Sequence, residues 1–482
     1  MTPAAVDAPP RPARRTKLVC TLGPSTEGRE AELVAAGMDV ARLNFSHGTA
    51  ETRGRALRAI RHASERGGQP VAALADLSGP KIRIGELAAG SAELTPGGTF
   101  RLSTARAVEA GDAAGAGVAY PRLTTDLRVG DRILLGDGAG ELRVERVEAD
   151  AVVTEVVRGG TIRSRTGVGI PSERRSGGPL TAKDRSDART TIELGFDYVA
   201  QSFIRRAADV AALRRVLGPD GPPIVAKVET RPAIERFDDI LDGVAAVMIA
   251  RGDLGVELPF EEVPLVQKQL VRRALDRGVP TIVATQMLES MIAAPRPTRA
   301  EVSDVANAVF DGADAIMLSA ETAIGQFPAL AADAAVRIAR WCEEHGRDYL
   351  PGGARAPTGS DAGSLAYAAV ALADAEAEVA AIACYTSTGR TARLLSSLRP
   401  SVPIVAFSPE PGTVARLALV HGVVPRSLAD PVPIPGRLAA LRTALRRDPA
   451  IGPASAVVLV ASTTLAGGAP NLLELHRVPI DG

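Results

Sequence analysis

The chain has 482 residues and no net formal charge at pH 7, with 46% apolar and 23% charged residues. This length is enough for about three domains, and the composition is ordinary for a globular protein. Zero net charge argues against binding to nucleic acid through bulk charge. No apolar run approaches the roughly 20 residues of a membrane span, so we expect neither a nucleic-acid nor a membrane partner.

The N-terminal segment and the cysteines indicate a cytoplasmic protein. Residues 1–14 are rich in Ala and Pro and lack the apolar stretch of a secretory signal, so we expect a disordered tail. The three cysteines, Cys20, Cys342 and Cys384, are odd in number and far apart. Such spacing is typical neither of a disulfide framework nor of a zinc site.

From Thr16 onward, strand patterns alternate with helical patterns such as Glu51–Glu65 and Ala207–Leu217. Eight strands with helices between them fit a closed (β/α)8 TIM barrel better than an open sheet. We expect this barrel at residues 15–83 and 176–349. The predicted strands are Lys17–Leu22, Val40–Phe45, Val71–Leu77, Tyr198–Phe203, Ile224–Val228, Ala246–Ala250, Thr281–Thr285 and Ala315–Leu318.

The gap between the third and fourth predicted strands is much longer than the others. It is rich in Gly, Thr and Val and contains short alternating runs such as Arg132–Leu135 and Ala151–Val157. This pattern predicts a small β domain inserted after the third barrel strand, at residues 84–175.

After a linker rich in Pro, Gly and Ala, Leu350–Pro357, the chain returns to alternating strands and helices. We expect a third, α/β domain at residues 358–482. Its predicted strands lie near Val379–Cys384, Ile404–Phe407 and Val457–Ala461.

Two short strings each join a buried strand to charged residues at its end. They are Ile224–Thr230, with Lys227 and Glu229, and Met248–Gly255, with Asp253. Two carboxylates there can hold a divalent cation, and Lys227 faces the same way as Glu229 because strand side chains repeat every two residues. Such a site suits the handling of a phosphoryl group. The alternative interpretation is a surface salt bridge at a loop entrance.

Arginine is the default cation of this chain, which has 51 Arg and only 5 Lys. A position that keeps Lys can require a compact ammonium or a shiftable pKa, with chance as the alternative explanation. The five are Lys17, Lys81, Lys183, Lys227 and Lys268.

Polar residues end strands all around the predicted barrel, at the end where barrel enzymes place their chemistry. A purely structural barrel would not need such residues. They are Arg42, Asn44, Ser46, Asp76, Ser78, Lys227, Glu229, Asp253, Thr285, Gln286, Ser319 and Glu321.

Five longer motifs follow one another in the segments Arg14–Thr26, Ala41–Gly48, Ala250–Glu257, Ala284–Met291 and Pro297–Asn307. They closely resemble pyruvate kinase, from about residue 14 to about residue 350 and more loosely to the C-terminus. The resemblance implies a barrel, a small β-barrel lid domain inserted after strand three and a C-terminal α/β regulatory domain. It also implies transfer of a phosphoryl group from phosphoenolpyruvate to ADP, giving pyruvate and ATP in the final step of glycolysis.

The resemblance also implies roles for residues at the reacting centre. Lys227 would neutralise charge on the phosphoryl group in flight, and Arg42 would contact that group. Glu229 and Asp253 would bind Mg²⁺ or Mn²⁺. Gly252 and the helix that follows it would offer backbone N–H groups to the substrate carboxylate.

The remaining roles concern the proton, the nucleotide and a monovalent cation. Thr285 would sit near the carbon that receives a proton, and Ser319 and Glu321 would support that relay. His47, Arg83 and Asn44 would lie on the nucleotide side. The monovalent-cation site would be lined by Asn44, Ser46, Asp76, Leu77 and Lys81.

The segment from Leu77 to Ile84 resembles the branch of the family that does not need potassium. Many members carry Glu at the position of Lys81, and those members typically need the ion. A tethered ammonium can occupy roughly the place of a free monovalent cation, so we expect no K⁺ requirement. The alternative is a surface lysine in a loop.

Two segments leave questions open. The hinge Gly167–Arg175 has Gly169 where the family usually has Asn, and it lacks the usual apolar run. It could mark a paralogue kept for binding or regulation, or one turned to a related phosphoryl transfer. The loop Thr386–Thr391 resembles the family's site for a phosphorylated effector, the alternative being an ordinary helix N-cap. Its candidate contacts are Thr386, Ser387, Thr388 and Thr391. The family suggests a homotetramer.

Overall fold

The computed structural model describes residues 14–105, 110–136, 138, 140–353, 360–429, 434–452, 455–462 and 470–479. The expected tail, residues 1–14, lies outside the described residues except for Arg14. Of the predicted linker, only residues 350–353 are described.

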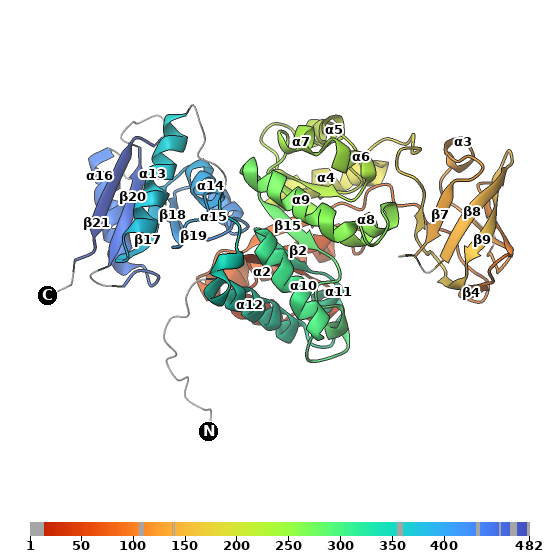
Figure 1. The fold of residues 1–482 in the computed structure, drawn as a ribbon, viewed down its shortest axis with the longest axis horizontal. Coiled ribbons are helices and arrows are strands. Elements are labelled where there is room, and N and C mark those ends of the chain that lie inside the picture. The colour runs from red at the N-terminus through yellow and green to blue at the C-terminus, as the bar shows by residue number, and fades with distance from the viewer. Residues whose placement is uncertain are drawn as a thin grey trace, which may run out of the picture.

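Eight parallel strands form a closed barrel in the middle of the molecule, in the order β1-β16-β15-β14-β13-β12-β3-β2 (Figure 1). The predicted fold class is confirmed, and each predicted barrel strand is present to within two residues at either end. The strands are β1 (Lys17–Thr21), β2 (Val40–Asn44), β3 (Ala72–Asp76), β12 (Tyr198–Gln201), β13 (Ile224–Val228), β14 (Ala246–Ala250), β15 (Thr281–Ala284) and β16 (Ala315–Leu318).

The barrel strands are apolar along their whole length because both of their faces are buried. Val19, Leu74 and Met248 belong to the cluster inside the barrel. Their neighbours Leu18 and Ala73 belong to the cluster between strands and helices. This division follows from the alternation of side chains along a strand.

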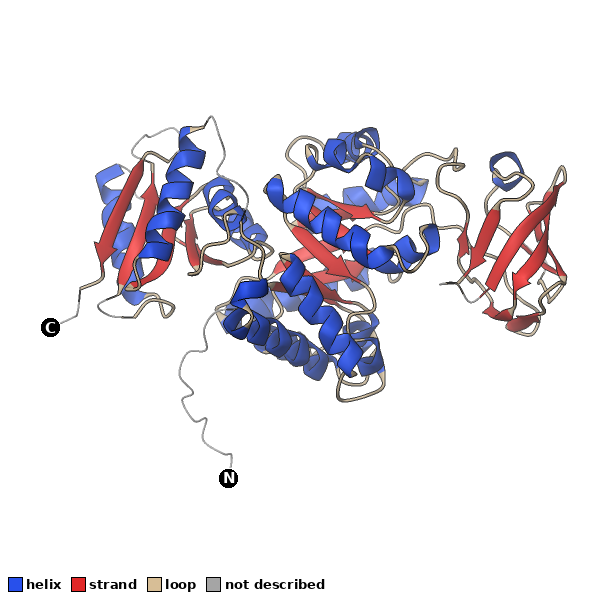
Figure 2. Ribbon diagram, in the orientation of Figure 1, coloured by secondary structure: helices blue, strands red, loops and turns tan. Residues whose placement is uncertain are grey.

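Helices surround the barrel (Figure 2). Three of them begin with a threonine capping box, at Thr49, Thr181 and Thr298. The barrel helices are α1 (Glu30–Ala35), α2 (Ala50–Gly67), α4 (Ala182–Leu194), α5 (Ala207–Leu217), α6 (Arg231–Glu235), α7 (Phe237–Leu241), α8 (Arg251–Glu257), α9 (Val263–Asp276), α10 (Arg299–Asp311), α11 (Ala320–Ala323) and α12 (Pro328–His345). Short 3-10 turns are η1 (Pro24–Thr26), η2 (Glu289–Ile292) and η3 (Arg347–Tyr349).

The lid is a separate sheet domain between β3 and β12, on one side of the barrel (Figure 1). A six-stranded sheet, β11-β7-β8-β9-β5-β6, and a two-stranded sheet, β10-β4, enclose one apolar core. Its elements are β4 (Ser91–Leu94), β5 (Thr99–Ser103), β6 (Gly115–Gly117), α3 (Leu123–Asp126), β7 (Arg132–Leu135), β8 (Gly140–Val147), β9 (Ala151–Arg158), β10 (Gly160–Arg163) and β11 (Val168–Gly169).

The C-terminal unit is a five-stranded sheet, in the order β19-β18-β17-β20-β21, with helices packed against it. Ala418 and Leu419 of this unit join the cluster inside the barrel, and Tyr198 Oη donates to Arg416 O at 2.9 Å. The unit therefore closes the amino end of the barrel and leaves the carboxyl end to the lid. Its elements are α13 (Asp361–Ala375), β17 (Val379–Tyr385), α14 (Arg390–Ser397), β18 (Ile404–Ser408), α15 (Pro411–Leu417), β19 (Val423–Ser427), α16 (Ile434–Arg447), β20 (Ala456–Ala461) and β21 (Leu472–Arg477).

Within the part of the chain that the structure describes, every helix is too short or too polar to cross a bilayer.

Candidate active site

Ion pairs link the carboxyl ends of β2, β3 and β13. Arg42 on β2 donates from Nε to Asp76 Oδ2 on β3 at 2.7 Å. Lys227 Nζ on β13 lies 3.5 Å from Asp76 Oδ1 and 3.4 Å from Glu229 Oε2. The same ammonium donates to Ser202 Oγ at 2.8 Å. The structure therefore brings the predicted Arg42, Asp76, Lys227 and Glu229 into one network.

The network keeps Lys227 and Asp76 charged. Burial alone would lower the pKa of Lys227, but the Asp76 and Glu229 carboxylates raise that pKa well above its ordinary value. Burial alone would raise the pKa of Asp76, but Lys227 and Arg42 hold it below its usual range. At neutral pH the site therefore presents a fixed ammonium, whose side chain is only 12% exposed.

Glu229 is the carboxylate whose negative charge the surrounding protein groups compensate least. Its Oε1 accepts from the Phe203 N–H at 2.6 Å, whereas its buried Oε2 has no hydrogen-bond donor. Burial raises the pKa of Glu229 to about 7; the Lys227 charge opposes that rise, and the Asp253 charge adds to it. A buried oxygen in need of positive charge is what a hard divalent cation requires of a ligand.

The residues present fit a divalent cation held partly by substrate. Glu229 and Asp253 supply two carboxylates, and no group of three or more acidic, His or Cys side chains suited to a metal occurs among the described residues. Mg²⁺ usually keeps several waters and binds through one or two carboxylates together with substrate oxygens. Two protein carboxylates are therefore sufficient for Mg²⁺ here, whereas a structural zinc site would need more.

Lys81 contacts a different group from the one expected. Its Nζ donates to Asp253 Oδ1 at 3.0 Å, with side-chain exposures of 38% and 28%. The sequence had placed Lys81 beside Asn44 and Ser46. The hinge instead directs the side chain past Gly167, where an added Cβ would lie 3.5 Å from Lys81 Cε. The ammonium thus lies against one of the two candidate metal ligands.

Formal charges within the group of ion-paired side chains around Lys227 and Asp253 balance before any substrate binds. The three carboxylates are Asp76, Glu229 and Asp253, and the three cations facing them are Arg42, Lys227 and Lys81. A substrate that carries both a carboxylate and a phosphoryl group adds negative charge that these side chains alone do not balance. A divalent cation would restore the balance.

Thr285 is held in a strained backbone conformation at the end of β15. Its φ is +72° and that of Gln286 is +55°, values that a β-branched or long side chain rarely adopts. Arg251 fixes this turn by donating to Thr285 O at 2.6 Å while pairing with both oxygens of Asp304. Thr285 Oγ1 accepts from the Gly252 N–H at 2.7 Å. The predicted Thr285 and Gly252 therefore meet each other directly.

Ser319 and Glu321 lie on the neighbouring turn after β16. Glu321 is buried, and its two oxygens accept from Ser319 N at 2.6 Å and from Leu288 N at 3.0 Å. Leu288 lies three residues after Thr285. Glu321 therefore joins the turn of Ser319 to the turn of Thr285.

The loops after β2 and β3 meet at Ser46 and Ser78, whose hydroxyls lie 3.1 Å apart. Asn44 Oδ1 accepts from Ser46 N at 3.0 Å. Leu77, predicted to line the monovalent-cation site, has its side chain buried in the apolar core. Its carbonyl accepts from Ser202 Oγ at 2.8 Å, so Leu77 helps to place the acceptor of Lys227.

The two remaining nucleotide-side residues are exposed and lie apart from the ion-pair network. His47 follows Ser46 on the loop after β2. Arg83 lies on the hinge, where its Nη1 donates to Arg165 O at 3.0 Å.

The candidate effector loop lies in the C-terminal unit, away from this site. Thr386 Oγ1 caps the turn by accepting from Gly389 N at 2.9 Å. Ser387 and Thr388 are exposed, and Thr391 lies in the first turn of α14.

Sequence reasoning missed three residues that support the site. Thr21 ends β1 and Ser202 directly follows β12, and the rule of polar strand ends would have found both. Thr21 Oγ1 accepts from Arg42 Nη1 at 2.9 Å. Arg251 lay inside a quoted motif, but its partner Asp304 is far away in sequence, and no local pattern indicated the pair.

Fold and charges together define the class: a (β/α)8-barrel enzyme with a lid, built to bind anionic, phosphorylated substrates. The family model described as pyruvate kinase, barrel domain, matches residues 13–332, and the pyruvate kinase alpha/beta domain matches residues 363–476. The chain belongs to the pyruvate kinase family.

Curated relatives agree with this assignment. A pyruvate kinase of Geobacillus stearothermophilus is 40% identical over 96% of this chain and 80% of its own length. One of Mycobacterium tuberculosis is 40% identical over 97% of this chain and 99% of its own length. Pyruvate kinase 2 of Synechocystis is 42% identical over 86% of this chain and 71% of its own length.

Proposed function

We propose that this chain transfers the phosphoryl group of phosphoenolpyruvate to ADP, giving pyruvate and ATP. The observation that carries the proposal is the network in which Lys227 lies between Asp76, Glu229 and Ser202, with Arg42 beside it. Phosphoryl transfer needs fixed positive charge where negative charge spreads over the moving group. A permanently charged, nearly buried ammonium meets that need.

Lys227 and Arg42 are held in fixed positions before the substrate binds. Lys227 Nζ is held by three partners, so it does not have to reorganise when the substrate arrives. Arg42 is held by Asp76 and Thr21 Oγ1, and it presents its guanidinium on the same side of the barrel. We assign both side chains to the phosphoryl group.

Glu229 and Asp253 would hold the divalent cation, Mg²⁺ or Mn²⁺, which when bound supplies a Lewis acid for the substrate's carboxylate and enolate oxygens. Lys81 must then either break its ion pair with Asp253 or share that carboxylate with the metal. The backbone N–H groups at the start of α8 would face the substrate carboxylate. Gly252 N is bonded to Thr285 Oγ1 here, so binding would exchange that contact.

Thr285 is positioned to handle the proton. The Thr285 hydroxyl donates to Ala284 O and accepts from Gly252 N. When the hydroxyl rotates away from Ala284 O, its proton becomes available to the substrate. Glu321 has both oxygens occupied by backbone N–H groups and would act by holding Ser319 and the Thr285 turn in place. We therefore assign proton delivery to the Thr285 hydroxyl, which regains its proton from solvent water, and positioning to Glu321.

The altered hinge does not favour a non-catalytic paralogue. Gly169 packs against α8, where an added Cβ would overlap Val256 Cγ1. Ser172 Oγ donates to Glu257 Oε2, also on α8. The changed residues thus fit the hinge to the helix that begins beside Asp253.

A coupled assay that follows pyruvate formation from phosphoenolpyruvate and ADP tests the proposed function. We expect turnover that depends on both substrates and on Mg²⁺ or Mn²⁺. Absence of pyruvate formation in folded protein with both substrates and the metal present would contradict the proposal.

Several finer properties are also part of this proposal and rest on the family. They are a cytoplasmic, homotetrameric enzyme and a phosphorylated allosteric effector bound at the loop Thr386–Thr391. The exposed hydroxyls of Ser387 and Thr388 beside the first turn of α14 support the effector site.

We further propose that the enzyme needs no potassium, because the Lys81 ammonium supplies the positive charge that a free monovalent cation would otherwise add at this end of the barrel. Activity should be similar in potassium and in tetramethylammonium salts at equal ionic strength, which must be matched because screening alters the binding of charged substrates. Lys81→Glu should lower activity in the absence of potassium, since it places a second carboxylate beside Asp253. Potassium should restore part of the loss.

Lys268→Glu is the matched control, because Lys268 also pairs with an aspartate, Asp311, but on the outer helices. That variant should show no new potassium dependence. A parent enzyme that is inert until potassium is added would refute this role of Lys81.

A further inference from the structure

A lysine that the proposed mechanism does not use contacts the loop after β2, and its neighbour Asp184 contacts the loop after β3. Lys183 lies in the first turn of α4, the first helix after the hinge from the lid. Its Nζ donates to Phe45 O at 2.6 Å and to Asp187 on the next turn. Phe45 begins the loop after β2, which carries Ser46 and His47. Lys183 thus connects α4, the first barrel helix after the lid, to the loop that carries the predicted nucleotide-side residue His47.

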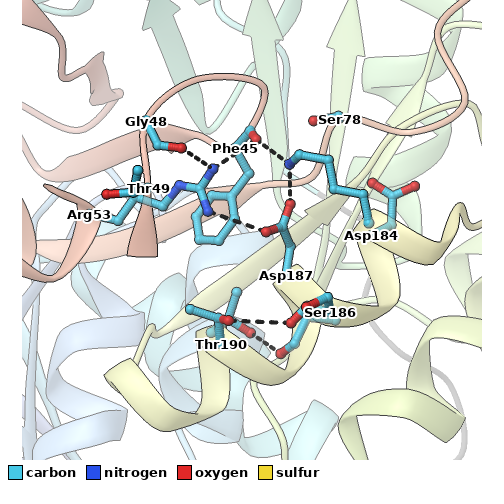
Figure 3. Close-up of polar contacts among 12 residues, drawn as sticks. Phe45, Gly48, Thr49, Arg53, Ser78, Asp184, Ser186, Asp187 and Thr190 are labelled. Carbon is cyan, nitrogen blue, oxygen red and sulfur yellow. Dashed lines mark hydrogen bonds and ion pairs between the residues drawn. The ribbon is translucent and has the colours of Figure 1, made fainter. Parts of the chain in front are cut away.

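Arg53 on α2 completes the hold on this loop. Its Nη2 donates to the carbonyls of Phe45, His47 and Gly48 at 2.9, 3.0 and 3.2 Å, and its Nη1 donates to Asp187 Oδ1 at 3.2 Å. Its guanidinium lies over the Phe45 ring at 4.0 Å. Figure 3 shows the Arg53 guanidinium bonded directly to Asp187, with the ring of Phe45 beside the guanidinium. Three carbonyls of this one loop are thereby fixed around one cation.

The same turn of α4 holds the loop after β3. Asp184 is fully buried, and its Oδ1 accepts from Gly79 N at 3.0 Å. Gly79 has a φ of +65°, and an added Cβ would lie 2.8 Å from Ser202 Cβ. Because Ser202 accepts from Lys227, the placement of Gly79 bears on the catalytic ammonium. One helical turn therefore contacts both loops that meet at Ser46 and Ser78.

Stability alone does not account for Lys183. Its side chain is 52% exposed, and ion pairs that are so exposed contribute about 0–1 kcal/mol. The chain uses Arg at almost every other cationic position. Here the side chain must reach a carbonyl that Arg53 already occupies, and a compact ammonium fits beside a guanidinium better than a second planar fork does.

We propose that three residues of α4 are positioning residues, namely Lys183, Asp184 and Asp187, together called the α4 clamp. The clamp holds the loop Phe45–Gly48 in the conformation that binds the nucleotide and connects this loop to the segment that follows the lid. The clamp does not touch the reacting atoms. It acts by binding the carbonyl of Phe45, in the loop after β2, and the amide of Gly79, in the loop after β3. This inference rests on the proposed function only for the identity of the nucleotide, ADP.

The test compares Lys183→Met with Lys268→Met in the full-length enzyme. Lys268 is matched because its side chain is 50% exposed and pairs with Asp311, but it contacts no substrate loop. We expect Lys183→Met to raise the KM for ADP about tenfold, with phosphoenolpyruvate binding changed less than about twofold. Lys268→Met should leave both unchanged, and the two variants should lose similar, small amounts of thermal stability.

Amide hydrogen exchange provides a readout independent of catalysis. The amides of residues 46–49 should exchange faster in Lys183→Met than in the parent, and Lys268→Met should match the parent. If Lys183→Met fails to fold, Lys183→Gln serves instead, because its shorter side chain keeps polarity but does not reach Phe45 O. An unchanged KM for ADP with unchanged loop exchange would overturn the proposal. Equal weakening of both substrates would also overturn it.

A parent enzyme that makes no pyruvate would refute the proposed function, yet the exchange comparison would still decide whether the clamp holds the loop.

Discussion

Replacing Lys227 with Ala should lower kcat at least ~1000-fold while metal binding persists. The ammonium is the only cation among the described residues that lies within 3.5 Å of both Asp76 and Glu229. Arg42, the other cation assigned to the phosphoryl group, is held by Asp76 and Thr21 Oγ1 and does not replace it. Glu229 and Asp253 stay in place, and removal of a competing cation should keep the metal affinity equal or make it tighter. Steady-state kinetics and Mn²⁺ titration measure the two effects separately.

Two further variants guard this result against a loss of folding. Lys227→Met keeps most of the buried volume and should be as inactive as the Ala variant, which attributes the loss to the missing charge. Lys227→Arg should also be impaired, because the planar guanidinium cannot reproduce the contact with Ser202 Oγ at 2.8 Å and both carboxylates at once. Turnover near that of the parent in any folded Lys227 variant would remove the residue from the mechanism.

The barrel could be predicted because its determinants are local. Each strand is a short apolar run with a polar end, and parallel neighbours bring those ends to one face. That is why Arg42, Asp76, Lys227 and Glu229 could be grouped before any coordinates were known. The buried neighbour Ser202 follows the same rule and was overlooked.

Contacts that depend on the path of a long loop could not be predicted. The partner of Lys81 is decided by how the hinge runs past Gly167, and the sequence contains no local pattern for that path. The Arg251–Asp304 pair and the clamp on Phe45 join segments far apart in the chain. Such pairs are fixed by the packing of helices around the barrel, so only the three-dimensional structure identifies them.

Replacing Glu229 with Gln should weaken Mg²⁺ activation by about ten- to a hundredfold and leave the metal-free protein at least as heat-stable as the parent. The first effect follows because an amide oxygen replaces an anionic ligand of a hard cation. The second follows because burial raises the pKa of Glu229 to about 7, so its ionised form opposes folding at pH values above the ordinary carboxyl range. Gln removes that charge, while Lys227 keeps Asp76 as a partner.

Glu257→Gln is the matched control for this experiment. Burial also raises the pKa of Glu257, but its partner is Ser172 on the hinge and it is not one of the candidate metal ligands. The metal dependence of that variant should therefore equal that of the parent, whereas Glu229→Gln shifts it. A parent enzyme that keeps its activity after thorough chelation would defeat the metal assignment. A metal-free Glu229→Gln protein that unfolds at a much lower temperature would show instead that the carboxylate stabilises the site through Lys227, against the electrostatic argument given above.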